Sequence, residues 1–104
     1  MMREKKRYLL VKFTGEEKLT SETVKHLVYE AIFQFIGELG ASKAAVQVIK
    51  FDAKTQTGVV KCATAMLEET IAAFALKRYW HKKSVRIETL KATGLINRLK
   101  DAAT

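Results

Sequence analysis

The chain has 104 residues, of which 48% are hydrophobic and 29% charged, and its formal net charge is +8 at pH 7. This length fits one domain, residues 1–104, and the hydrophobic content excludes a wholly disordered chain. The single cysteine, Cys62, excludes an internal disulfide and a zinc site built from several thiolates. Because no apolar run reaches the roughly 18 residues of a membrane span and the N-terminus does not resemble a secretory signal, we expect a cytoplasmic protein with no membrane partner.

The first half of the chain predicts a strand followed by a helix. The strand covers residues 7–13, and alternate positions put one set of side chains on each face. Thr20 or Ser21 can cap the helix, and Gly40 is placed to end it. The residues expected to face the core recur at helical spacing: Val24, Leu27, Val28, Ala31, Phe35 and Leu39.

The second half predicts three more strands and one more helix. Residues 45–52 and 59–63 form a hairpin, Thr64 can cap the second helix, residues 85–91 form the last strand, and residues 95–99 begin a short terminal helix. The order β-α-β-β-α-β predicts an α+β fold, a two-layer α/β sandwich of the RNA-recognition-like (ferredoxin-like) type with a short C-terminal helix. In that fold the first and third strands are central, and the last strand pairs with the first.

Positive charge is concentrated at the two ends of the sequence. Residues 1–12 have a net charge of +4 and residues 77–100 of +7, whereas residues 13–76 have −2. Because the first and last strands are expected to be neighbours, the two basic segments should form one surface that suits a polyanion such as nucleic acid. A solvated surface that keeps the protein soluble is the alternative. The residues expected on this surface are Lys5, Lys6, Arg7, Lys12, Arg86 and Lys91, and Lys82, Lys83, Arg98 and Lys100 can extend it.

Aromatic residues lie among these charges. Tyr8 is placed either to stack on a base or to pack within the fold, and Trp80 either stacks or covers the end of the second helix. The third predicted strand, GVVKCA, has none of the aromatic residues with which RNA-recognition domains usually stack bases there. Contacts with phosphate and with RNA shape are therefore the better expectation.

No catalytic or metal-binding constellation is recognised. His26 and His81 do not have metal-ligand spacing with each other or with Cys62, so no metal site is expected. The adjacent pairs Glu16/Glu17 and Glu68/Glu69 are read as surface or helix-terminal charges rather than as an acid/base couple.

The first helix has a second apolar stripe. Tyr29, Phe33 and Ile36 follow one another at i, i+4 and i+7, on a different side from the expected core positions. Either the helix is buried over a wide face, or this stripe is exposed and binds a partner protein.

Four segments together resemble one protein family. RYLLVKF at residues 7–13, IGELGA at 36–41, the pair VIKFD and GVVKC, and RIETLKATGLINRLK at 86–100 are similar in order and spacing to ribonuclease P protein component 2, a small subunit of the tRNA-processing RNase P. The resemblance covers nearly the whole chain. It implies an RNA-contact role for the C-terminal segment, which we extend to Lys91, Thr93, Gly94 and Arg98.

The resemblance implies a non-catalytic subunit without an active site or cofactor of its own. The expected partners are RNase P RNA with its bound Mg²⁺, ribonuclease P protein component 3, and precursor tRNA in the assembled complex, and a homodimer within a heterotetramer is one assembly that it allows. Two alternatives stay open: a free-standing RNA-binding or chaperone domain, and a small ferredoxin-like enzyme or metabolite-binding regulator. The enzyme would turn over its substrate without RNA, whereas the free-standing domain would bind RNA tightly without a protein partner.

Overall fold

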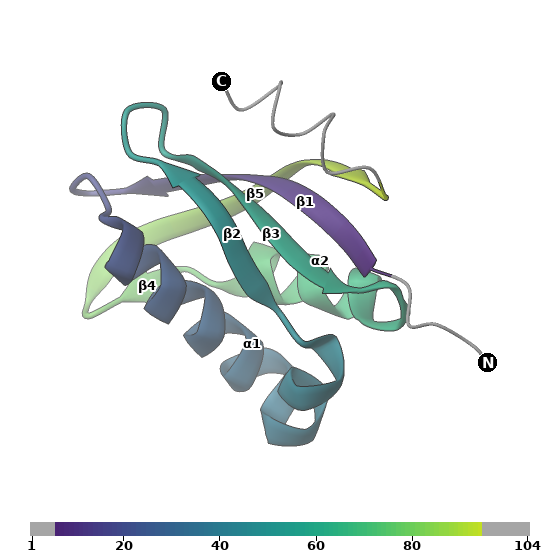
Figure 1. The fold of residues 1–104 in the computed structure, drawn as a ribbon. Coiled ribbons are helices and arrows are strands. Elements are labelled where there is room, and N and C mark those ends of the chain that lie inside the picture. Colours follow the sequence, from purple (N-terminus) through teal and green to yellow (C-terminus); the bar gives the residue numbers. More distant parts are fainter. Residues whose placement is uncertain (1–5, 95–104) are drawn as a thin grey trace.

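The computed structural model describes residues 6–94, which form an antiparallel sheet with two helices on one face (Figure 1). In chain order the elements are β1 (Lys6–Gly15), α1 (Ser21–Ala44), β2 (Gln47–Asp52), β3 (Thr57–Ala63), a 3₁₀ turn (Thr64–Met66), α2 (Leu67–Leu76), β4 (Tyr79–Trp80) and β5 (Lys83–Thr93). The strand order is β2-β3-β1-β5-β4, with β1 paired to both β3 and β5. The predicted order and central strands are therefore confirmed, with the two-residue β4 as an addition. The predicted helix at residues 95–99 lies outside the described residues.

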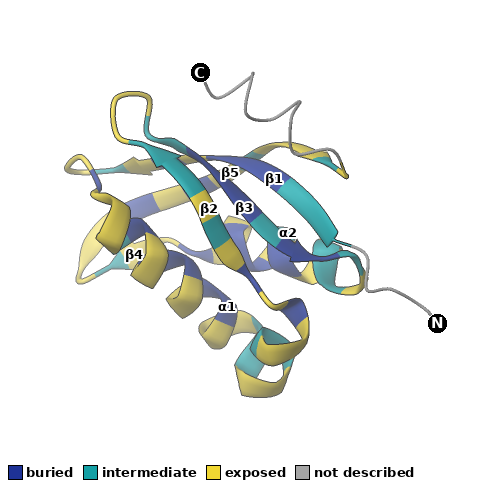
Figure 2. Ribbon diagram, in the orientation of Figure 1, coloured by how far each residue is buried: buried dark blue, intermediate teal, exposed yellow. Residues whose placement is uncertain are grey.

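The core lies between the sheet and the helices (Figure 2). On β1, alternate residues Leu9, Val11 and Phe13 are buried against the helices, as the strand periodicity predicts. Cys62 and Phe74 bring β3 and α2 into the same cluster. Burial of this apolar surface is the main stabilising term for a sandwich of this size.

The course of α1 differs from the sequence prediction at its C-terminal end. Thr20 caps the helix as predicted, since its Oγ1 accepts a hydrogen bond from the Thr23 backbone N–H at 3.2 Å. Gly40 does not end the helix. The left-handed φ of +85° belongs to Gly37, where the helix breaks before continuing to Ala44.

Gly40 has a different role, because a Cβ at this position would collide with the Ile36 side chain. Two residues of α1 that the sequence predicts in the core are exposed. Phe35 and Leu39, predicted in the core, are 40% and 71% exposed, and Ile32 is buried instead. Leu39 follows the break, so the periodicity of the first segment does not apply to it.

The start of α2 also departs from the prediction. Thr64 begins the 3₁₀ turn, and no side-chain hydrogen bond caps either that turn or α2. Leu67 and Ile71 pack against the core and Phe74 is buried, whereas Ala75 is exposed at the helix surface. Helical spacing in the sequence predicts one core-facing stripe of Leu67, Ile71, Phe74 and Ala75, and the structure confirms it for the first three residues only.

Gln56 fixes the β2–β3 turn to the loop that precedes α1. Its Oε1 accepts a hydrogen bond from the Leu19 backbone N–H at 2.8 Å, and its Nε2 donates to the Leu19 carbonyl at 3.2 Å. Its own carbonyl accepts from the Phe13 N–H at 2.8 Å. These bonds hold together two connections at the same end of the sheet.

Candidate RNA-binding surface

The pairing of β1 with β5 brings the two basic segments of the sequence together. Tyr8 lies opposite Thr93, Leu10 opposite Lys91 and Lys12 opposite Glu88. Since neighbouring antiparallel residues share a face, and Leu9 and Val11 face the helices, these side chains belong to the opposite face of the sheet. We call this side, turned away from α1 and α2, the outer face.

The outer face carries more positive than negative charge. Its register follows from the strand pairs, which place six basic and two acidic residues there among those described. Tyr8, Leu10 and Val59 form a small apolar cluster near its middle. The basic residues are Lys6, Lys12, Lys50, Lys61, Arg86 and Lys91, and the acidic residues are Asp52 and Glu88.

Lys50 and Lys61 were not singled out from the sequence. Lys61 lies opposite Tyr8, and Lys50 lies opposite Val59. The alternation of Lys61 with buried Val60 and Cys62 was the available signal, because it predicts that Lys61 points away from the core. For Lys50 the signal was weaker, since the pairing of β2 with β3 shifts register between Val48 and Lys50.

Arg7 and Gly94 lie apart from this group. Arg7 is opposite Cys62, whose side chain is buried against the helices, so Arg7 is on the helix side of β1. A Cβ at Gly94 would meet the Arg7 guanidinium, which shows that the two residues are in close contact. Thr93, opposite Tyr8, is half-buried. Lys5, Arg98 and Lys100 of the predicted surface lie outside the described residues.

The segment from Lys77 to Arg86 contains both neutralised and unpaired cations. Lys77 is buried, and its Nζ lies 3.3 Å from Glu30 Oε1 and donates a hydrogen bond to Gln34 Oε1 at 2.9 Å. Lys83 Nζ lies 2.9 Å from Glu17 Oε2, with both side chains largely exposed. Arg78, Lys82 and Arg86 form no ion pair with any residue between 6 and 94.

The β4–β5 hairpin turn is held to the rest of the fold by an acidic residue. The Ser84 N–H donates a hydrogen bond to Glu16 Oε2 at 2.7 Å. At the turn itself His81 and Lys82 both have positive φ, 48° and 68°, and Trp80 packs on the core and lies edge-on to His81. Trp80 is therefore half-buried against the core of the fold.

The second stripe on α1 is exposed at two of its three positions. Tyr29 is 53% and Phe33 51% exposed, whereas Ile36 is half-buried and packs against the core. Tyr29 and Phe33 therefore form an apolar surface on the side of α1 away from the core. Charges on α1 are balanced, with three acidic and two basic residues: Glu22, Glu30 and Glu38, and Lys25 and Lys43.

Among residues 6–94, the remaining ionisable groups do not gather into a metal site. Burial raises the pKa of the Cys62 thiol above its ordinary value, which keeps it protonated and unreactive. Among residues 6–94 no three His, Cys, Asp or Glu side chains are close enough to hold a metal ion. Glu68 and Glu69 lie in the first turn of α2, where negative charge is favourable.

None of the helices between residues 6 and 94 is both long and apolar enough to cross a membrane.

Comparison with known proteins places the chain in a family. Residues 7–104 match the model of the Rpp14/Pop5 family. Ribonuclease P protein component 2 of Pyrococcus abyssi is 36% identical over 99 residues, which cover 95% of this chain and 84% of that protein. The protein of the same name from Methanocaldococcus jannaschii is 30% identical, with 95% and 72% covered.

A solved structure shares the fold at low sequence identity. A chain in the cryo-EM structure of yeast ribonuclease MRP superposes with a TM-score of 0.70 and 9% identity, over 90% of this chain and 77% of that one. The fold likeness and the family match agree with the resemblance seen in the sequence. The chain therefore belongs to the Rpp14/Pop5 family.

Proposed function

We propose that this chain is a non-catalytic protein subunit of ribonuclease P, which binds and stabilises the catalytic RNA together with a partner protein. In this role it supports removal of the 5′ leader from precursor tRNA. Membership of the family and the names of its archaeal relatives support the assignment. The cytoplasm is the compartment that we propose for it.

The excess of basic residues on the outer face carries the RNA-binding part of the proposal. Lysine and arginine side chains that neutralise phosphates release the counterions of the RNA, which gives affinity without sequence recognition. Lys12, Lys61 and Lys91 come from three neighbouring strands and form no ion pair with a described residue. The sheet fixes the backbone positions of these three lysines. Binding to a phosphate backbone therefore does not require a loop to become ordered.

Base stacking has a minor role in this proposal. Tyr8 is the only aromatic residue that β1, β3 and β5 place on the outer face, and it is half-buried beside Leu10 and Val59. A domain that stacks successive bases needs several exposed aromatic rings. Phosphate contacts are the main mode that we infer.

The apolar surface of Tyr29 and Phe33 is proposed as the contact for a protein partner, for which ribonuclease P protein component 3 is the candidate. Exposed aromatic residues on a helix with balanced charge suit a protein interface better than a phosphate backbone. We propose that Mg²⁺ binds to the RNA rather than to this chain.

Reconstitution tests the proposal. Cleavage of precursor tRNA by the cognate RNase P RNA would be measured at limiting Mg²⁺ with this chain, with component 3, and with both. We expect the rate to rise when both proteins are present. If both proteins leave cleavage unchanged while the chain still binds RNA, it is a free-standing RNA-binding domain and the proposal is wrong.

A further inference from the structure

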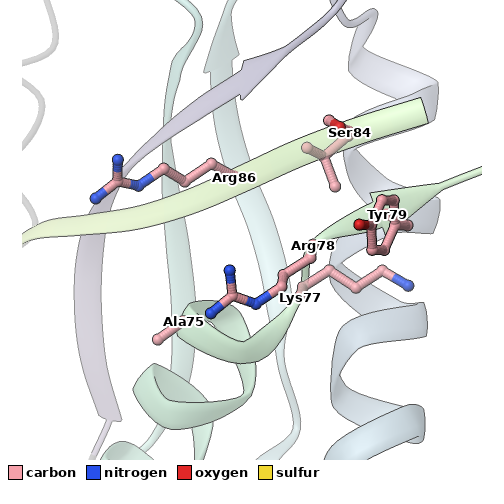
Figure 3. A pocket seen from close by; sticks show the side chains of 7 residues that line it. Ala75, Lys77, Arg78, Tyr79, Ser84 and Arg86 are labelled. Atoms are coloured by element: carbon pink, nitrogen blue, oxygen red, sulfur yellow. The ribbon is translucent and has the colours of Figure 1, made fainter.

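A polar hollow of about 510 Å³ lies between the C-terminal end of α2 and β5 (Figure 3). Its lining includes Arg78, Arg86 and Lys77, together with the hydroxyl-bearing side chains of Tyr79 and Ser84. Only two of its lining residues are aliphatic. Such a lining suits an anionic ligand rather than an apolar one.

The two arginines face this hollow without a carboxylate partner. Figure 3 shows their guanidinium groups extending toward the same side, Arg86 from β5 and Arg78 from the segment after α2, while Lys77 points away from them. Lys77 is neutralised by Glu30, but neither arginine forms an ion pair with a residue between 6 and 94. The hollow therefore holds two unpaired positive charges.

The backbone fixes the spacing of the two walls. The Val85 N–H donates a hydrogen bond to the Arg78 carbonyl at 2.8 Å, and Tyr79 pairs with Ser84 in the β4–β5 ladder. Since these contacts use main-chain atoms, the arginine side chains stay available to a ligand. Two planar guanidinium groups on a fixed frame match the geometry of phosphate oxygens.

The hollow is continuous with the outer face. Arg86 lies opposite Thr14 on β1. Thr14 follows Lys12 by two residues, so both are on the same face of the sheet. Ser84 and Tyr79 follow on that side toward the edge of the sheet. A phosphate backbone that crosses the outer face at Lys12 and Arg86 can therefore continue over the edge of β5.

We propose that the hollow between Arg78 and Arg86 is a second RNA phosphate site, which extends the RNA-binding surface around the edge of the sheet. The two guanidinium groups bind non-bridging phosphate oxygens, and the Tyr79 and Ser84 hydroxyls are neutral donors beside them. This inference rests on the proposed function, because the ligand is the RNA that the outer face binds.

The test compares two double variants of the full chain. R78A/R86A removes both charges from the hollow, and K25A/K43A removes two exposed charges from α1 as a matched control. Binding to the cognate RNase P RNA is measured across a salt series, and thermal unfolding checks that each variant is folded. R78K/R86K keeps the charge but loses the planar fork.

We expect R78A/R86A to lower RNA affinity on the order of 10-fold and to reduce the slope of log K against log[salt] by about 1.4–1.8, as two lost phosphate contacts require. K25A/K43A should change the slope by less than about 0.5. R78K/R86K should keep the wild-type slope while losing part of the affinity, since its charges remain.

Three results would overturn the inference, and they are distinguishable. If the wild type binds the RNA and R78A/R86A matches it in affinity and slope, the hollow is not an RNA site. The same holds if R78A/R86A loses only its binding to component 3, because the hollow then takes a protein ligand. If the wild type itself fails to bind the RNA, the proposed function fails first and the inference with it.

Discussion

The outer face of the sheet and the outer side of α1 differ in the partner that each can bind. The outer face has six basic and two acidic residues among those described, most of them on neighbouring strands. On α1 the charges nearly cancel, and three of its four exposed large hydrophobic side chains are aromatic. One surface suits a polyanion and the other a protein, which is the division of roles that the proposed function requires.

The same contrast occurs between adjacent residues. Lys77 is buried and bound to Glu30 and Gln34 on α1, whereas the next residue, Arg78, is exposed and has no acidic partner in the described part of the chain. The net charge of a segment therefore overstates how many of its cations are available to bind RNA. Only the cations that the fold leaves unpaired can bind phosphate without first breaking an internal contact.

The largest effect is expected from reversing charge on the outer face. K12E/K61E/K91E replaces three phosphate contacts by repulsion, and we expect RNA affinity to fall by roughly 100-fold or more at low salt. Filter binding with the cognate RNA measures this change. The control K25E/K43E carries two similar reversals on α1 and should change affinity by less than about 3-fold. Equal losses in both variants would mean that net charge, and not the outer face, governs binding.

Loss of the exposed aromatic residues should affect the protein partner alone. Y29S/F33S removes two large side chains that are about half exposed, so we expect binding to component 3 to weaken by roughly 30-fold or more. The unfolding temperature and the RNA affinity should stay near wild type. Co-purification and calorimetry with component 3 measure the effect. Ile36 is left unchanged because it packs against the core. A variant that binds component 3 normally would show that this stripe is not the interface.

The layer structure could be predicted from the sequence because it depends on local patterns. Alternation in β1 identified Leu9, Val11 and Phe13, and the helix start at Thr20 followed from its capping side chain. The end of α1 was predicted wrongly at Gly40, and the break at Gly37 was not predicted. The segment IGELGA contains two glycines, and only the packing of Ile36 against Gly40 distinguishes the one that takes the positive φ.

The residues of the candidate site were harder to predict, because contacts between residues far apart in the sequence determine which cations lie on the surface and stay unpaired. The sequence identified the basic segments but treated all their cations alike. Lys77 forms an ion pair with Glu30 and donates a hydrogen bond to Gln34, which is 43 residues away in sequence. Lys61 joins the outer face through its pairing opposite Tyr8. Neither contact has a local signature beyond the strand alternation around Lys61.

A smaller effect should separate Lys77 from Arg78. K77A removes a buried hydrogen bond and an ion pair, and because Glu30 is half exposed and can be rehydrated, we expect a loss of about 1–2 kcal/mol in the free energy of unfolding. The salt dependence of RNA binding should not change. R78A should show the reverse, with normal stability in urea and a lower salt slope. If K77A lowers the slope as R78A does, then Lys77 also contacts RNA and the contrast between the two residues fails.

The smallest expected effect tests whether β3 alternates as described, with Lys61 on the outer face and Cys62 between the layers. Burial raises the pKa of the Cys62 thiol above the ordinary value of 9.0 that it has in the unfolded chain, so the unfolded chain loses this proton at a lower pH than the folded chain. The stability that this contributes is complete below pH 9 and is lost as pH rises through the folded pKa. The free energy of unfolding in urea would be measured for the wild type and for C62A at pH 7 and pH 10. Tyrosines and lysines titrate in both proteins, so the difference between the two proteins reports the thiol alone. We expect the stability advantage of the wild type to be smaller at pH 10. A constant advantage would mean that the pKa of this thiol is not raised in the folded chain, which would contradict its burial between the layers.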